Sequence, residues 1–108
     1  MPINILHEET QLTVTEWATD TFGEPDNTMA ILDRMMEEIK ELKWELIKEL
    51  GEGGNARAVG RELADVTVFI YQLAQHSGID LFTEIDDKMS INRSRNWVVT
   101  ENGVGQHV

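Results

Sequence analysis

Four acidic residues in the middle of the chain have a spacing that would let them act together. Glu38 and Glu41 are three residues apart, and Glu62 and Asp65 repeat this spacing after a glycine-rich gap. Residues three apart on a helix lie on one face, so each pair would present two carboxylates side by side. If the two helices run antiparallel and face each other, the four carboxylates form one oxygen-only site.

Such a site favours a hard divalent cation. Oxygen ligands select Mg²⁺ or Mn²⁺ over zinc, and Mg²⁺ takes the rest of its coordination shell from water and substrate phosphates. Glu62 falls in the apolar sector of its helix with Val66 and Phe69, where an unpaired carboxylate is unfavourable. A salt bridge to an arginine is the structural alternative. A di-iron site is disfavoured, because neither Glu38 nor Glu62 is followed by a histidine three residues later.

A proton acceptor and a phosphate-binding face are also present. A carboxylate next to the cation could take the proton of a bound water, and the candidates are Glu37, Glu41 and Glu45. Further along, Lys88, Asn92 and Arg95 are spaced to share one helix face. In an acidic chain this stripe suits phosphate oxygens; pairing with neighbouring aspartates on the surface is the alternative.

Hydrophobic spacing predicts four helices that would position these residues. Asp26 or Asn27 would cap the second helix, Asn55 the third and Asp80 the fourth. The predicted helices cover about residues 8–19, 28–50, 56–76 and 81–97, followed by an irregular tail over 98–108. Only Ile5–Leu6 and the threonine-rich segment near Thr13 are compatible with a strand. Short loops between helices predict an all-α four-helix bundle, a single domain over 1–108.

The apolar surface of this bundle predicts an oligomer. The third helix is apolar around most of its circumference, and Trp44 and Ile47 lie beyond the main apolar stripe of the second. Four short helices can cover a central helix only in part, so an apolar patch should remain. A symmetric dimer is the simplest way to cover it.

Composition narrows the function further. The 108 residues include 20 acidic and 9 basic side chains, and the net charge of −11 disfavours binding to a nucleic acid polymer. The lack of cysteine excludes a disulfide scaffold, a thiolate zinc site and a cysteine nucleophile. No segment reaches the length of a membrane span, and Met1–Glu9 has no signal-peptide pattern. We therefore expect a cytoplasmic protein with no membrane partner.

The acidic pairs lie in motifs that resemble those of a known superfamily. Glu37–Leu42 and Glu62–Val66 resemble the EExxE…ExxD signature of the MazG-like all-α nucleoside triphosphate pyrophosphohydrolases. Lys88–Trp97 resembles the K…N…R stretch that follows this signature. Glu16–Phe22 and the ending Gly103–Val108 are similar to the branch of dATP/dGTP diphosphohydrolases.

The resemblance implies Mg²⁺-dependent hydrolysis, with Mn²⁺ possible, of a (deoxy)nucleoside triphosphate to the monophosphate and pyrophosphate. A purine dNTP is the implied substrate, and homodimers or homotetramers are the implied assemblies. By position, the resemblance assigns the metal to Glu38, Glu41, Glu62 and Asp65, the phosphates to Lys88, Asn92 and Arg95, and base stacking to Trp17. One departure is Val98–Asn102, where the branch has a Gly-Pro-Asp-like turn.

Two alternatives to a purine dNTP hydrolase stay open. A dUTPase-like or broad house-cleaning hydrolase would use the same fold and the same cation. A non-enzymatic helical module for oligomerisation or regulation would use the acidic pairs in salt bridges. Pyrophosphate release with and without Mg²⁺ separates the second alternative from the enzymes.

Overall fold

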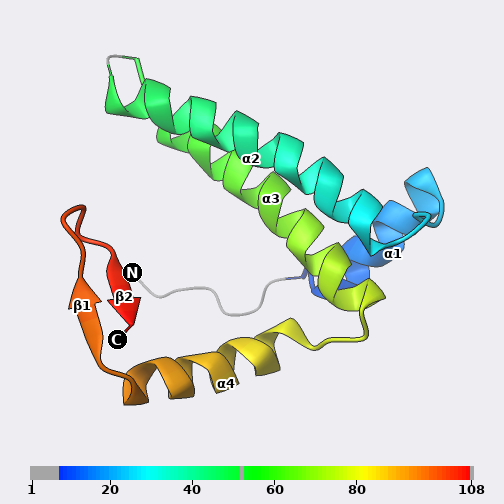
Figure 1. Ribbon diagram of the computed structural model, residues 1–108. Helices are drawn as coiled ribbons and strands as arrows, with labels where there is room; N and C mark the ends of the chain where they lie inside the picture. Colours follow the sequence, from blue (N-terminus) through cyan, green and yellow to red (C-terminus); the bar gives the residue numbers. More distant parts are fainter. Residues whose placement is uncertain (1–7, 52, 108) are drawn as a thin grey trace.

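The computed structural model describes residues 8–51 and 53–107 and shows four helices followed by a short hairpin (Figure 1). The elements are α1 (Gln11–Phe22), α2 (Thr28–Leu50), α3 (Ala56–His76), α4 (Leu81–Ser94), β1 (Trp97–Val99) and β2 (Gly105–His107). Among the helices of these residues, none combines the length and the apolar character that a membrane crossing requires. The prediction of an all-α fold with four helices is confirmed.

Side-chain caps determine where the helices begin. Asn27, Asn55 and Asp80 accept hydrogen bonds from backbone amides of the first turns of α2, α3 and α4, as predicted. The predicted start of the first helix was three residues too early, because Thr10 caps α1 and exchanges hydrogen bonds with Thr13 in a capping box. The threonine-rich segment is therefore helical. Ile5–Leu6 lies outside the described residues.

The helices α2 and α3 run antiparallel side by side, and α1 packs across α3 at the end where α2 begins (Figure 1). The buried apolar residues come from these three helices: Val14, Ala18, Ile31, Val59 and Ala74. All five are small or β-branched, so the helices can approach closely. This three-helix core determines how the acidic residues of α2 and α3 face each other.

The fourth helix extends away from this core (Figure 1). The side chain of Gln11 holds its start: Oε1 accepts from the Leu81 amide at 3.0 Å, and Nε2 donates to the Ile79 carbonyl at 2.6 Å. Tyr71 and Phe82 also meet edge to face there. Beyond this anchor α4 has no buried residue. Within one chain the bundle therefore consists of α1, α2 and α3.

The hairpin corrects two predictions about the end of the chain. The last helix ends at Ser94 rather than at residue 97, and the tail is not irregular, because β1 pairs antiparallel with β2. Val98 and Val99 favour an extended backbone, and Gly103 supplies the positive φ of 79° that the turn between the strands requires. The Trp97 indole donates to the Asn92 carbonyl at 2.7 Å and so closes the end of α4.

A candidate metal centre beside a cleft

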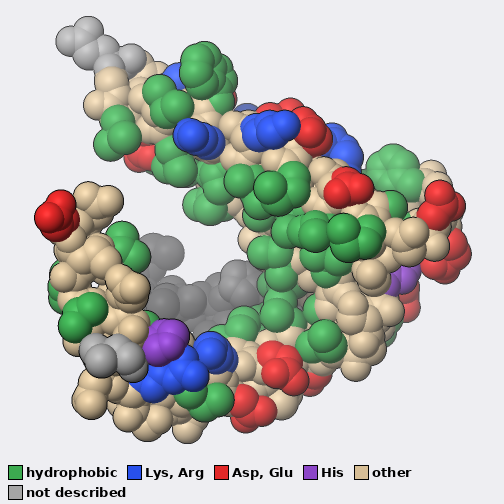
Figure 2. Space-filling model, viewed as in Figure 1, with side chains coloured by type: hydrophobic (Ala, Val, Ile, Leu, Met, Phe, Trp, Pro, Cys, Tyr) green, Lys and Arg blue, Asp and Glu red, His purple; other side chains and the backbone are tan. Residues whose placement is uncertain are grey.

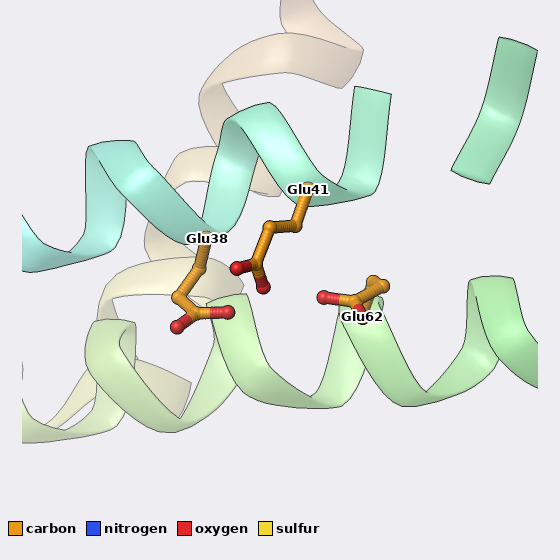
Figure 3. A group of neighbouring side chains, drawn as sticks. All are labelled: Glu38, Glu41 and Glu62. Atoms are coloured by element: carbon orange, nitrogen blue, oxygen red, sulfur yellow. The ribbon is translucent and has the colours of Figure 1, made fainter. Parts of the chain in front are cut away.

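Three of the four predicted ligands converge between α2 and α3 (Figure 3). Glu38 and Glu41 point from α2 toward Glu62 on α3, and one carboxylate oxygen of each lies within 4.8 Å of the others. We call these three residues the carboxylate cluster. Their separation suits oxygen atoms that share a single cation, because a cation between them replaces like-charge repulsion by attraction.

The electrostatics of the cluster show an excess of negative charge. Burial raises the pKa of Glu38, and Glu41 raises it further. Arg34 opposes these effects from an ion pair of 2.7 Å between its Nη2 and Glu38 Oε1. Burial is also the largest cause that raises the pKa of Glu62, and the negative charges of Glu41 and Asp65 raise it further. The positive charge of Arg34 therefore does not neutralise the negative charge of the carboxylate cluster.

An oxygen of Glu62 shows that the residues fit a divalent cation. Oε2 is buried and has no hydrogen-bond partner among the described residues. A buried carboxylate oxygen without a partner is unfavourable, and a hard cation would satisfy it together with the oxygens of Glu38 and Glu41. The donor set contains only carboxylates, which suits Mg²⁺ or Mn²⁺.

Asp65, the fourth predicted ligand, lies at the margin of the cluster. It is exposed and is not among the three residues whose oxygens converge. Its charge nevertheless raises the pKa of Glu38 and of Glu62, and it lines the adjacent cleft. Its role as a ligand stays a prediction.

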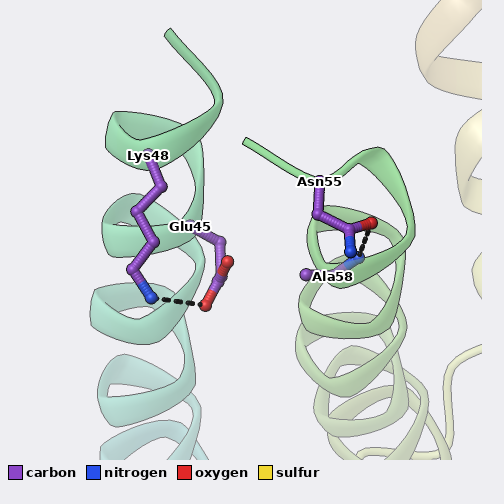
Figure 4. A network of polar contacts seen from close by, with 4 residues as sticks. All are labelled: Glu45, Lys48, Asn55 and Ala58. Atoms are coloured by element: carbon purple, nitrogen blue, oxygen red, sulfur yellow. Dashed lines mark hydrogen bonds and ion pairs between the residues drawn. The ribbon is translucent and has the colours of Figure 1, made fainter. Parts of the chain in front are cut away.

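The three candidate proton acceptors lie at different distances from the cluster. Glu41 belongs to it. Glu45 is half-buried, pairs with Lys48 at 3.2 Å near the capped start of α3 (Figure 4), and contributes to the raised pKa of Glu62. Glu37 pairs with Lys40 at 3.3 Å on the solvent side of α2. The geometry thus brings Glu41 and Glu45, but not Glu37, next to the candidate ligands.

A cleft of about 570 Å³ between α1, α2 and α3 adjoins the cluster at Glu38. Its volume lies in the range of small-molecule sites. Glu38 and Asp65 line it, and so does Trp17, whose ring meets that of Phe22 edge to face at 5.5 Å. The predicted base-stacking residue is therefore in the cleft wall.

Sequence reasoning missed Arg34 as a component of this cleft. Its guanidinium lies over the Phe69 ring, 5.9 Å from the ring centre, while it pairs with Glu38. The spacing of four residues between Arg34 and Glu38 was the signal that could have identified it, since such pairs lie on one helix face.

The predicted phosphate-binding residues are not at the cluster within one chain. Lys88 and Asn92 lie on α4 and Arg95 is its C-cap, and α4 does not pack along α2 or α3. Asn92 Oδ1 is buried and has no hydrogen-bond partner among the described residues. Phosphate binding by these residues stays a prediction.

An all-α fold with paired carboxylates on two facing helices defines a class of metal-binding helical proteins. Within that class the chain belongs to the MazG-like family, whose family model matches residues 31–107. The fold is similar to that of the cyanophage S-2L MazG-like pyrophosphohydrolase bound to dGDP and three catalytic Mn²⁺ ions per active site. The TM-score is 0.69 and the identity 26%, and the match covers 91% of this chain and 92% of that one.

Two relatives are named dATP/dGTP diphosphohydrolase. One, from Salmonella phage PMBT28, is 38% identical over 101 residues, which are 93% of this chain and 31% of that protein. The other, from cyanophage S-2L, is 34% identical over 65 residues, 58% of this chain and 62% of that protein. The matched region thus spans less than two thirds of either relative.

Proposed function

We propose that this protein hydrolyses a (deoxy)nucleoside triphosphate, preferentially a purine dNTP, to the monophosphate and pyrophosphate with Mg²⁺ or Mn²⁺. The observation that carries the proposal is the convergence of Glu38, Glu41 and Glu62 beside a cleft of small-molecule size, which Glu38 lines. The two relatives named dATP/dGTP diphosphohydrolase and the dGDP and Mn²⁺ of the similar structure support it. Such a substrate is expected in the cytoplasm.

The cluster and Asp65 would hold the cation. When bound, Mg²⁺ or Mn²⁺ neutralises charge on phosphate oxygens and lowers the pKa of a coordinated water. Water adds its oxygen to one phosphorus of the α–β anhydride link, and the bond from that phosphorus to the bridging oxygen breaks. We assign the proton acceptor to Glu45, because its charge is close enough to raise the pKa of Glu62 although it is not one of the three cluster residues.

We infer that the chain assembles as a homodimer or homotetramer. Large apolar side chains are exposed on α2, α4 and the hairpin, among them Trp44 at 61%, Ile47, Phe82 and Val99. Figure 2 shows a hollow between the α2–α3 pair and the arm formed by α4 and the hairpin, with hydrophobic side chains along the α2–α3 side. A second copy would cover such surface.

A panel of eight ribo- and deoxyribonucleoside triphosphates tests the proposed function. We expect pyrophosphate release that requires Mg²⁺ or Mn²⁺ and is fastest with dATP or dGTP. Fast release from dUTP or from all substrates alike would instead indicate a dUTPase-like or broad house-cleaning hydrolase. No release from any substrate at saturating cation would contradict an enzymatic function.

A further inference from the structure

We propose that the side-chain amide of Gln72 on α3 contacts the edge of the nucleobase and determines which bases the cleft accepts. The inference rests on the proposed function, because it takes a nucleotide as the occupant of the cleft. It begins from the lining of that cleft, in which Gln72 lies on the same helix as Asp65 and Phe69.

The cleft follows one face of α3 away from the carboxylates. Asp65, Phe69, Gln72 and His76 all line it, and their spacings of four, three and four residues place them on a single stripe. At a rise of 1.5 Å per residue, Gln72 is displaced from Asp65 by about 10 Å along the axis. A nucleotide whose phosphates are held at the carboxylates therefore extends its sugar and base toward Gln72.

Aromatic rings form the walls at this part of the cleft. Trp17 and Phe22 lie on α1, and Phe69 lies on α3 one turn before Gln72. The Arg34 guanidinium lies over the Phe69 ring, so the rings of α1 are the ones that suit the face of a planar base. The polar edge of the base is then left to a hydrogen-bonding group. Arg34 is held at the carboxylate end by its 2.7 Å ion pair with Glu38. Gln72 is therefore the first polar side chain beyond Asp65 on the α3 stripe that lines the cleft, with His76 one turn further.

The chemistry of an amide suits both purines. A glutamine side chain carries two donors and one acceptor oxygen. It can therefore pair with the amino group and a ring nitrogen of adenine, or with the carbonyl oxygen and the ring N–H of guanine. A glutamate at this position accepts only. It would match the two N–H donors of guanine and would face an acceptor nitrogen of adenine with a negative charge.

The test compares Gln72→Glu and Gln72→Leu with Gln75→Glu as the matched control. Gln75 is on the same helix but accepts from Gln11 Nε2 at 3.0 Å, and it does not line the cleft. The control therefore adds the same charge to α3 and can keep that hydrogen bond. For each variant, kcat/KM is measured with dATP and dGTP by pyrophosphate release, and binding of dAMP and dGMP is measured by calorimetry with Mn²⁺ present.

We expect Gln72→Glu to shift the dGTP to dATP ratio of kcat/KM toward dGTP by about tenfold or more, since a mismatched charged hydrogen bond is involved. Gln72→Leu should lower kcat/KM for both purines by about tenfold. Gln75→Glu should leave the ratio within about twofold of that of the parent chain. Because added charge near the phosphates affects both substrates alike, the ratio isolates the base.

The inference is overturned if the dGTP to dATP ratio of Gln72→Glu equals that of Gln75→Glu in folded variants. The binding measurements separate this result from a failure of the proposed function. If the parent chain releases no pyrophosphate but the dGMP to dAMP affinity ratio still shifts in Gln72→Glu, the hydrolase proposal fails and the base contact stands. If the affinity ratio does not shift either, the base contact is wrong.

Discussion

Replacing Arg34 by glutamine should destabilise the protein in the absence of divalent cations. Its Nη2 lies 2.7 Å from Glu38 Oε1, and the Glu38 side chain is only 8% exposed, while that of Arg34 is 55% exposed. Removing one partner of a fully buried ion pair costs about 3–5 kcal/mol. Water screens the exposed half of Arg34, so we expect a smaller loss, about 1–2 kcal/mol. For a domain of this size the loss corresponds to a decrease in Tm of about 4–16 °C.

A divalent cation should remove most of this loss. A cation between Glu38, Glu41 and Glu62 supplies the positive charge that the guanidinium provides to Glu38 in its absence. Arg34→Gln should therefore bind Mn²⁺ more tightly than the parent chain, because no guanidinium competes with the cation for Glu38, and tighter binding stabilises the folded variant more. We therefore expect the unfolding free energies of the parent chain and of Arg34→Gln to differ by less than about 0.5 kcal/mol at saturating Mn²⁺.

Unfolding followed by far-UV circular dichroism, with and without Mn²⁺ and at equal chain concentration, measures both effects. Lys40→Gln is the control, since it removes the same charge from α2 and breaks a pair with Glu37 in which the side chains are 73% and 59% exposed. Its cost should not exceed about 0.5 kcal/mol in either condition. An equal destabilisation by Arg34→Gln with and without Mn²⁺ would refute the claim that Glu38 faces a cation.

Four further predictions concern the acidic residues, Arg95, the pH dependence of stability and the assembly. Glu41→Gln and Asp65→Asn should each abolish cation-dependent hydrolysis and keep or raise the cation-free Tm, because each removes a like charge; a pyrophosphate assay and melting curves check this, and full activity of either variant would contradict the assignment. Arg95→Ala should weaken nucleotide binding about ten- to a hundredfold and Mg²⁺ binding far less, whereas calorimetry showing equal losses would make Arg95 a structural partner of the acidic residues. Since the pKa values of Glu38 and Glu62 lie above the usual 4.5 in the folded state, these groups favour folding at low pH and this contribution is lost as the pH rises through the raised values. Melting curves of the cation-free protein against pH should therefore show a smaller loss toward neutral pH in Glu62→Gln than in the parent chain. Light scattering at physiological salt should give a mass of at least twice the 12.3 kDa of one chain, and a monodisperse monomer at tens of micromolar would exclude the oligomer.

The sequence was sufficient to predict the helices that carry the carboxylates. The apolar stripe of α2 and the apolar circumference of α3 predicted that these segments are helical. Their bounds could be predicted because helix caps and glycine-rich stops are local signals in the sequence. The spacing of three within each acidic pair predicted that four carboxylates would meet, and three of them, Glu38, Glu41 and Glu62, do. The position of Asp65 at the margin of the cluster could not be predicted in this way. It depends on the rotation of α3 relative to α2, which is determined by packing between the helices and not by spacing along one helix.

The end of the chain was harder to predict for two reasons. The strand β1 (Trp97–Val99) is only three residues long. Alternation of apolar and polar residues over so short a segment is a weak signal of a strand. The apolar residues of α4, such as Phe82 and Ile85, follow a helical pattern, which predicts an apolar face but not what the face contacts. The separation of α4 from the core is therefore a tertiary property.

The central claim is that Glu38, Glu41 and Glu62 hold the cation on which hydrolysis depends. The most direct measurement titrates Mn²⁺ into the protein and follows bound Mn²⁺ and pyrophosphate release from dGTP in the same samples. Glu49→Gln, a change at an exposed position of α2, serves as the control for Glu62→Gln. We predict that Glu62→Gln loses both Mn²⁺ binding and pyrophosphate release while Glu49→Gln keeps both. Unchanged Mn²⁺ binding and pyrophosphate release in a folded Glu62→Gln protein would contradict the account.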